Sequence, residues 1–295
     1  MQKDINFKDC FKDKNVIKTK NQIYNLIKNL SDYVEKEENF LICKTLDLKT
    51  QDLLLLKSFD DKQLKKLKNV TKQRLKGMPL NKILKNEDFY LDNFYVNNHV
   101  LAPRKETELL VEQSLKYISD FNNLPTEQIK VLDLCCGSGI IGLSVAKYST
   151  KKTNVVLLDK SKKALKVAQK NLKKLNLENV KIIKSDMFSH LKKDYKFDII
   201  ISNPPYIQTS SLSLLQKGVI KYDPKMALDG GVDGLKFYKI IAQNAKEFLN
   251  KKGVVLVEIG FDQSMQVQNL FKNQGFGTKT LKDYSNNDRI VIAWL

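Results

Sequence analysis

The sequence predicts an α/β protein in which a small helical domain precedes a doubly wound, mostly parallel sheet. From about Ile129 onward, apolar β-branched runs alternate with helical patterns, which is typical of repeated βαβ units. Residues 1 to about 85 instead carry apolar side chains at helical spacing. Two further strand-like runs near 278–284 and 289–294, joined by a polar segment, predict an antiparallel hairpin at the sheet edge.

The helical N-terminal domain is predicted over residues 1–85. One helical pattern starts near Thr19. Another helix begins after Asp60 and ends at Gly77, with Pro79 two residues on, as helix C-termini commonly do. The domain carries no catalytic constellation, so we expect it to recognise a substrate. The inward-facing apolar residues are Ile23, Leu26, Ile27, Leu30 and Val34 in the first helix and Leu64, Leu67, Val70 and Leu75 in the second.

A β-hairpin linker is predicted over residues 86–103, ahead of a catalytic domain over 104–295. Aromatic runs lie on both sides of Asp92-Asn93, a dipeptide suited to a two-residue turn. Thr107 is a candidate N-cap for the helix that follows. That helix would bury Leu109, Leu110, Val111, Leu115 and Ile118.

Five parallel strands are expected in the catalytic domain. Ser161 is a candidate N-cap for the helix after the second strand. The segment between Tyr206 and Lys236 is too long and polar for a simple connection, so we expect a loop that forms a lid or contacts a substrate. A helix over 236–250 follows. The strands are predicted near 130–134, 155–159, 180–184, 198–202 and 253–259.

Composition argues against several classes of protein. Hydrophobic residues make up 42% of the 295, enough for a proper core, and no apolar run approaches the roughly 20 residues that span a bilayer. The start has neither a signal-peptide nor a transit-peptide pattern, so we expect a cytoplasmic protein. The cysteines, Cys10, Cys43 and Cys135-Cys136, form no disulfide framework. His99 and His190 lie far from them, so no metal site is expected.

The net charge of +18 invites a nucleic-acid partner. Of the 51 basic residues, however, all but Arg74, Arg104 and Arg289 are lysines, and asparagine is also plentiful. This bias is typical of compositional drift across a whole sequence, with the lysines on solvated helix faces. Contact with a polyanion is therefore possible but not required.

The strand near 198–202 runs directly into Asn203-Pro204-Pro205-Tyr206. Each proline lacks an N–H and holds the residue before it extended, so the Asn203 side-chain oxygen and nearby carbonyls can face a cavity. Two fixed acceptors suit a planar, conjugated NH2 group, because they orient its nitrogen and stabilise the positive charge that grows there during attack. Tyr206 would stack on the planar group or form a wall beside it.

A second motif lies upstream, where the strand ending at Asp133 is followed by Cys135, Cys136, Gly137, Ser138 and Gly139. Such a turn admits a ligand to a helix N-terminus. About 20 residues further on, the next strand ends at Asp159, where a carboxylate can take both hydroxyls of a ribose.

Along the chain, the glycine-containing turn, then Asp159 and then Asn203-Pro204-Pro205-Tyr206 follow one another. This set of motifs resembles that of class I S-adenosylmethionine-dependent methyltransferases. The resemblance implies a Rossmann-like, seven-stranded, mostly parallel sheet with an antiparallel edge hairpin. It also implies S-adenosylmethionine as cofactor and S-adenosylhomocysteine as product. Asp133 would hold the turn, residues 135–139 the methionine part, Asp159 the ribose, and Asp186 with Met187 the adenine side.

Asn-Pro-Pro-Tyr is shared by enzymes that methylate adenine, guanine or glutamine amides, and the rest of the chain distinguishes them. Six segments resemble the release factor glutamine methyltransferases of the PrmC/HemK family: 74–80, 88–96, 104–108, 223–228, 257–260 and 283–289. The resemblance implies methylation of the glutamine amide nitrogen (N5) in the Gly-Gly-Gln (GGQ) motif of bacterial-type release factors, in support of translation termination. Asn203 and Pro204 would accept the amide hydrogens, and Pro205 and Tyr206 would wall the pocket. A monomer is expected.

The chain departs from the family pattern at four positions. Cys135 and Cys136 replace a glycine and a threonine of the usual turn, and Lys105 and Asn286 replace a proline and a glycine. A positive φ at Cys135 would be costly, so either the backbone there is ordinary or affinity for the cofactor is reduced. For Glu258 and Arg104, a structural role fits as well as a functional one.

Two other functions remain open from the sequence. A nucleic-acid exocyclic-amine methyltransferase is favoured by the charge, but a DNA enzyme needs a base-flipping recognition domain, for which there is no room. The second open function is that of a non-catalytic RNA- or ribosome-binding protein with the same fold. The intact Asn203-Pro204-Pro205-Tyr206 argues against it, since a pure binder needs no paired acceptors at the strand end.

Overall fold

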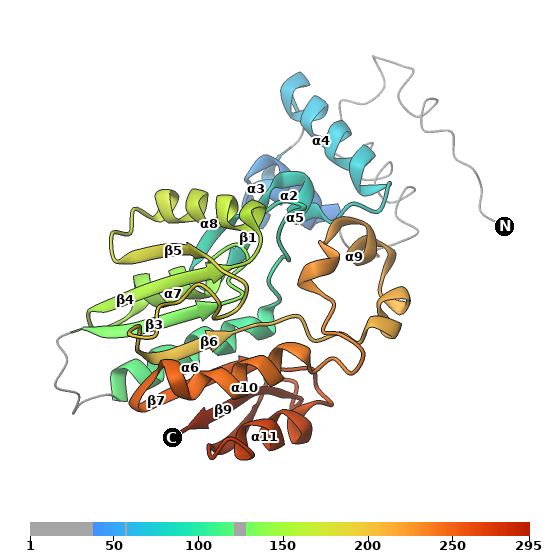
Figure 1. Ribbon diagram of the computed structural model, residues 1–295. Coiled ribbons are helices and arrows are strands. Elements are labelled where there is room, and N and C mark those ends of the chain that lie inside the picture. The colour runs from blue at the N-terminus through green and yellow to red at the C-terminus, as the bar shows by residue number, and fades with distance from the viewer. Residues whose placement is uncertain (1–37, 57, 121–127) are drawn as a thin grey trace. The chain divides into compact units, whose positions relative to one another are not determined.

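The structure, a computed structural model, describes residues 38–56, 58–120 and 128–295 (Figure 1). The predicted helical pattern near Thr19 and the residue Cys10 lie outside these ranges. The chain divides into two compact units, Met1–Leu84 and Lys85–Leu295. No helix within the described ranges combines the length and apolarity needed to cross a membrane.

The described part of the first unit is helical. Helix α4 begins after Asp60, whose carboxylate accepts a hydrogen bond from Gln63 N at 2.7 Å while Gln63 Oε1 accepts one from Asp60 N. Its Leu64, Leu67 and Val70 are buried as predicted, but Leu75 is 40% exposed because it follows the last helical residue. The helices are α2 (Glu38–Leu46), α3 (Thr50–Leu55), α4 (Asp61–Arg74) and α5 (Leu80–Leu84).

The second unit is built on a sheet of seven strands within residues 128–295, in the order β5-β4-β3-β6-β7-β9-β8. Five neighbouring strands are parallel, and β9 is antiparallel to both of its neighbours. The strand order reverses between β3 and β6, where α/β sheets bind ligands beyond the carboxyl ends of the strands. The strands are β3 (Ile129–Leu134), β4 (Thr153–Asp159), β5 (Val180–Lys184), β6 (Phe197–Ser202), β7 (Leu249–Glu258), β8 (Gly277–Lys282) and β9 (Asp288–Trp294).

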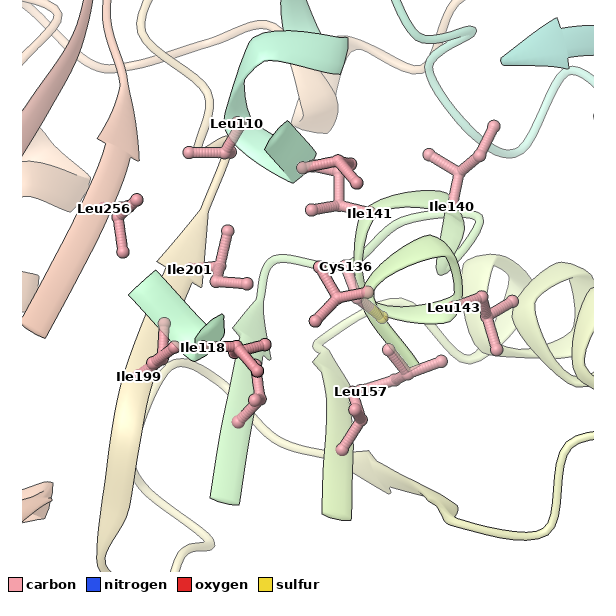
Figure 2. Packing of buried hydrophobic residues seen from close by; sticks show 14 of the residues in the cluster. Leu110, Ile118, Cys136, Ile140, Ile141, Leu143, Leu157, Ile199, Ile201 and Leu256 are labelled. Atoms are coloured by element: carbon pink, nitrogen blue, oxygen red, sulfur yellow. The ribbon is translucent and has the colours of Figure 1, made fainter. Parts of the chain in front are cut away.

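Helices cover both faces of this sheet, and alternate strand residues supply the two cores. On one face, Leu110 and Ile118 of α6 and Ile141 of α7 pack toward Ile199, Ile201 and Leu256 of the strands (Figure 2). The intervening residues, such as Ile200 and Val255, pack against α10 and α11 on the other face. The helices are α6 (Glu108–Asp120), α7 (Ile140–Tyr148), α8 (Lys162–Leu175), α10 (Lys236–Phe248) and α11 (Ser264–Lys272).

The hairpin of β1 (Asn86–Phe89) and β2 (Asp92–Tyr95) contacts α7 through Asp92, which accepts hydrogen bonds from Lys147 and Tyr148, and contacts α8 through Tyr95. Asn171 of α8, fully buried, accepts from Tyr95 N and donates to Tyr95 O and to Ser138 O. The hairpin turn is Tyr90-Leu91, because Phe89 pairs with Asp92, so the predicted turn at Asp92-Asn93 was wrong by two residues. Tyr90 has φ of 55°, which a turn-forming asparagine or glycine would ordinarily supply.

Two other local predictions need correction. The segment between Tyr206 and Lys236 contains short helices, η3 (Thr209–Leu214), α9 (Lys217–Tyr222) and η4 (Lys225–Ala227), and its later part is bonded back to residues 207–209. Thr107 lies inside the one-turn helix η2 (Lys105–Thr107), where the N-cap position is Arg104. Ser161, by contrast, caps α8 as predicted, accepting from Ala164 N at 3.2 Å.

Candidate active site

A cavity of about 1000 Å³ opens beyond the carboxyl ends of the central parallel strands, within the second unit. It lies where the strand order reverses, as expected for an α/β sheet. Nine predicted site residues line it: Cys135, Cys136, Gly137, Ser138, Asp159, Asp186, Met187, Asn203 and Pro205. The predicted residues Asp133, Gly139, Pro204 and Tyr206 are not among its described lining residues.

The turn after β3 has a strained backbone. Cys135, Gly137 and Gly139 have φ of 62°, 54° and 75°. An ordinary backbone at Cys135, one of the two outcomes left open by the sequence, is therefore excluded. A left-handed conformation costs a residue with a side chain about 1–2 kcal/mol, which the surrounding hydrogen bonds must offset. One of these bonds runs from Cys136 N to Leu158 O on the neighbouring strand, at 3.0 Å.

Asp133 fixes the start of α7 from below the turn. Its Oδ2 accepts a hydrogen bond from Gly142 N at 2.8 Å, while Oδ1 has no partner among the described residues. A Cβ on Gly142 would lie 2.9 Å from Asp133 Cβ and would also meet Leu157. Burial raises the pKa of Asp133 to about 7, although the bond from Gly142 opposes the rise.

Asp159 ends β4 at the cavity wall and closes the turn from the other side. Its Oδ2 accepts from Gly137 N at 2.9 Å and its Oδ1 from Ser161 N at 2.7 Å. Burial raises the pKa of Asp159, and these backbone bonds oppose the rise. A carboxylate oxygen can accept more than one hydrogen bond, so Asp159 keeps acceptor capacity toward the cavity.

Asp186 and Met187 follow β5 at the far side of the cavity. Asp186 forms an exposed ion pair with Lys160, at 2.6 Å. Met187 is buried, and its sulfur lies 3.7 Å from Cys135 Sγ. Phe188 stacks on Phe248 of α10, with ring centroids 4.9 Å apart, and both line the cavity.

The thiols beside the cavity are poorly nucleophilic. Burial raises the pKa of both Cys135 and Cys136, and the carboxylates of Asp159 and Asp133 add to the rise. Because the thiolate is the reactive form, these cysteines suit packing rather than chemistry.

Asn203 lies at the carboxyl end of β6 and is partly exposed to the cavity. Its Nδ2 is 3.4 Å from Oγ1 of Thr107, a nearly fully buried residue that also lines the cavity, so the hydrogen bond between them is long. Glu258, at the end of β7, is 2% exposed. Burial raises the pKa of Glu258 to about 7, and hydrogen bonds from Thr107 and Asn203 oppose the rise. The amide NH2 of Asn203 thus faces buried acceptors.

Pro204 and Tyr206 flank the lining residue Pro205 in the chain but are not themselves among the described lining residues. Pro204 is buried, and Tyr206 is half-buried against the core on the α10 side of the sheet. Burial raises the pKa of Tyr206 to about 12, with a further rise from the Glu258 carboxylate. Gln263 Nε2 donates to Tyr206 O at 3.0 Å, which fixes the chain just after the two prolines.

Sequence reasoning missed several lining residues. Thr107 was assigned only a capping role, and Phe188 and Phe248 were not singled out. Phe188 directly follows the Asp186-Met187 pair, which was a usable signal, but no sequence spacing connects Thr107 or Phe248 with the motifs. Among the described residues, no group of His, Cys, Asp and Glu side chains could hold a metal ion.

Comparisons with known proteins fit this geometry. Residues 118–231 match the family description "Methyltransferase small domain". The chain is 37% identical over 277 residues to a release factor glutamine methyltransferase of Clostridium acetobutylicum, covering 92% of this chain and 95% of that protein.

The chain belongs to the release factor glutamine methyltransferase family.

A second member, from Borreliella burgdorferi, is 39% identical over 259 residues and covers 85% of this chain and 87% of its own length. Among solved structures, a ribosomal protein L11 methylase from Lactobacillus delbrueckii subsp. bulgaricus is similar at 17% identity, with a TM-score of 0.45 over 65% of this chain and 80% of that one.

The lining residues fit the cofactor of this methyltransferase family. Behind the lining, Gly139 and Gly142 let α7 pack closely on the strands, because an added Cβ would lie 2.9 Å from Leu157 Cδ1 and Asp133 Cβ respectively. The wall then offers carboxylates for hydroxyl groups and a cationic centre, and apolar side chains such as Met187 and Phe188 for a flat base. This combination matches a nucleoside that carries a sulfonium.

The backbone conformation at Asn286 accounts for another of the departures from the family pattern. Asn286, where the family more often has glycine, has φ of 65°. Asparagine tolerates this conformation better than most residues. The loop around it is held by Asp283, whose Oδ1 accepts from Ser285 N and Asn287 N.

Proposed function

We propose that this protein transfers a methyl group from S-adenosylmethionine to the side-chain amide nitrogen of the glutamine in the Gly-Gly-Gln motif of peptide chain release factors. The observation that carries the proposal is the position of Asn203 at the carboxyl end of β6, in the same cavity as Asp159. Membership of the release factor glutamine methyltransferase family supports the choice of substrate.

The cofactor, when bound, supplies an electrophilic methyl group on a sulfonium. In the proposal, Asp159 accepts hydrogen bonds from ribose hydroxyls. Asp186, Met187 and Phe188 border the adenine, and residues 135–139 hold the methionine part. The acidic side chains also favour the positive charge.

The substrate amide is held by acceptors rather than activated by a base. Asn203 Oδ1 and the Pro204 carbonyl accept the two amide hydrogens, and Pro205 and Tyr206 bound the pocket. This grip orients the nitrogen toward the methyl group and stabilises the positive charge that it gains. The proton on the methylated nitrogen is then lost to water. Since the leaving group is a neutral thioether, the proposed reaction needs no metal.

Three further assignments belong to the proposal. The helical residues before Lys85 recognise the release factor, the protein acts as a monomer, and the reaction takes place in the cytoplasm. The first is tested by deleting residues 1–84, which should raise KM for the release factor far more than KM for S-adenosylmethionine.

The deciding experiment offers the purified protein radiolabelled S-adenosylmethionine with an unmodified release factor in one reaction and total RNA plus DNA in another. Label is expected on the release factor and should be lost when the glutamine of its Gly-Gly-Gln motif is changed. The net charge of +18 favours nucleic acid as the competing substrate. Label on nucleic acid alone would overturn the proposal, and saturable cofactor binding without transfer would indicate a non-catalytic binder.

A further inference from the structure

Two buried polar side chains lie beside Asn203: Thr107, which also lines the cavity, and Glu258, which is not among the described lining residues. Thr107 is 1% exposed and Glu258 is 2% exposed. Thr107 Oγ1 lies 3.4 Å from Asn203 Nδ2, and burial raises the pKa of the neighbouring Glu258 carboxylate while the donor groups of Thr107 and Asn203 lower it. Glu258 Oε2 has no partner among the described residues, so the carboxylate retains further accepting capacity.

The orientation of the Asn203 amide decides what it can bind. Its oxygen and NH2 group exchange places when the side chain rotates by half a turn, and only the oxygen can accept a hydrogen bond from a substrate NH2. Thr107 Oγ1, at the cavity wall, and the Glu258 carboxylate, behind it, are nearly fully buried acceptors beside the Asn203 NH2 group. They hold the NH2 group inward and leave Oδ1 for the cavity.

We propose that Glu258, acting together with Thr107, is a positioning residue that sets the amide orientation of Asn203 for methyl transfer. The inference rests on the proposed function and adds two residues to it. Glu258 touches neither substrate nor cofactor in this assignment. It acts through the asparagine.

The ionisation state of Glu258 affects the orientation of the Asn203 amide. An ionised carboxylate only accepts hydrogen bonds, whereas a protonated one also donates and competes with the Asn203 NH2 group. Burial brings the pKa of Glu258 to about 7, with Glu106 raising it and Arg289 lowering it. Tyr206 and Tyr238 also face this site, and Tyr238 OH donates to the Glu258 backbone carbonyl. Orientation, and with it kcat, should therefore weaken as pH falls through about 7.

Glu258→Gln tests this directly. A glutamine offers its neighbours one acceptor and one NH2 group, so the Asn203 amide has a donor facing it. We expect kcat with the release factor to fall by about 100-fold, as for loss of one preorganised transition-state contact. KM for S-adenosylmethionine should stay within about twofold, since the cofactor contacts are untouched. The rise of kcat between pH 6 and 8 should disappear.

Asp198→Asn is the matched control. Asp198 is also a buried carboxylate, 2% exposed, but it lies at the opposite end of β6, where it accepts from Lys130 N and Asn250 Nδ2. This variant should keep kcat near the wild-type value. Equal losses of kcat in both variants would overturn the proposal, because a general effect of removing a buried charge would then suffice. Wild-type kcat in Glu258→Gln would overturn it as well.

Thr107 gives an independent comparison. Thr107→Val removes the hydroxyl with little change of volume and should lower kcat, and Thr107→Ser should restore most of the activity lost in Thr107→Val. Equal kcat values for Thr107→Val and Thr107→Ser would show that the hydroxyl has no positioning role.

A spectroscopic measurement separates this inference from the proposed function. In full-length protein labelled with 15N at asparagine, the Asn203 side-chain NH2 resonances, assigned with Asn203→Ala, should shift with pH around 7 in the wild type. They should not do so in Glu258→Gln. This result stands even if the release factor proves not to be the substrate. Resonances that ignore pH in the wild type would overturn the link between Glu258 and Asn203.

Discussion

The role of Asn203 depends on its side-chain oxygen rather than on its place in a strand. Asn203→Ala should lower methyl transfer by about 100-fold or more, because one acceptor for the substrate amide is lost. Much of the affinity for S-adenosylmethionine should remain. Initial rates and calorimetric titration with the cofactor measure the two effects separately.

Asn179→Ala is a suitable control for this variant. Asn179 Nδ2 donates to Thr153 O, at the amino end of β4 and away from the cavity. Asn179→Ala should lower the free energy of unfolding and leave kcat unchanged. Unchanged turnover in Asn203→Ala would contradict the proposed role of the side chain.

Cys135 adopts φ of 62°, a value that glycine takes without cost. Cys135→Val should lower the free energy of unfolding by about 2 kcal/mol relative to Cys135→Gly, because a β-branched residue in this region is a severe outlier. Urea unfolding of the two variants provides the comparison, with Cys135→Ala expected between them. Equal stability of the valine and glycine variants would show that the turn relaxes easily.

Single residues also show how far the sequence could predict the site. Asn203 and Asp159 were predictable, because prolines and strand ends restrict where their side chains can point. Thr107 and Glu258 were not, since they are 151 positions apart, in η2 and at the end of β7, and no sequence spacing connects either of them with Asn203. The backbone at Cys135 was also beyond the sequence, which allowed two outcomes.

At the scale of elements, α7 can pack close to the sheet because Gly142, in its first turn, has no side chain. Gly142→Ala should destabilise the protein by about 2–3 kcal/mol, because the added Cβ would meet Asp133 and Leu157 in a packed core. It should also weaken cofactor binding, since the turn before α7 would shift. Ser144→Ala in the same helix is the control: its buried Oγ has no partner within the described residues, so its loss should be nearly neutral. Thermal unfolding of both variants tests this prediction. Comparable losses of stability in Gly142→Ala and Ser144→Ala would contradict it.

The strands were predicted well because five short apolar runs that contain β-branched residues leave few alternatives, and their observed bounds differ by four residues at most. The failures were short elements. The helices between Tyr206 and Lys236 are of three to six residues, too few to show a helical period. The hairpin turn was misplaced because Tyr90 supplies the positive φ that the sequence led us to expect from Asp92-Asn93.

At the scale of the whole molecule, buried acids connect stability with pH. Burial raises the pKa of Asp133 from 3.8 and that of Glu258 from 4.5, each to about 7. Because the folded-state values lie above the unfolded ones, each acid contributes stability that is fully present below about pH 4 and is lost as pH rises through about 7.

Asp133→Asn should remove one of these contributions. The difference in free energy of unfolding between wild type and Asp133→Asn should fall by about 1.4 kcal/mol per pH unit between pH 4.5 and 7. Urea titrations across this range give the slope for both proteins. Using the difference removes the charge repulsion that both proteins share, and a difference that does not change with pH would contradict the assignment.

The order of the strands has a consequence for biosynthesis. β9 follows every other described strand in the chain, yet it lies between β7 and β8. Until β9 leaves the ribosome, β7 has an unpaired edge of exposed backbone N–H and C=O groups next to strongly apolar residues. β8, synthesised earlier, has no neighbour to join. A nascent chain stalled before residue 288 would therefore expose an unpaired apolar strand edge that is prone to aggregation, and chaperones that bind such edges should act before β9 is available.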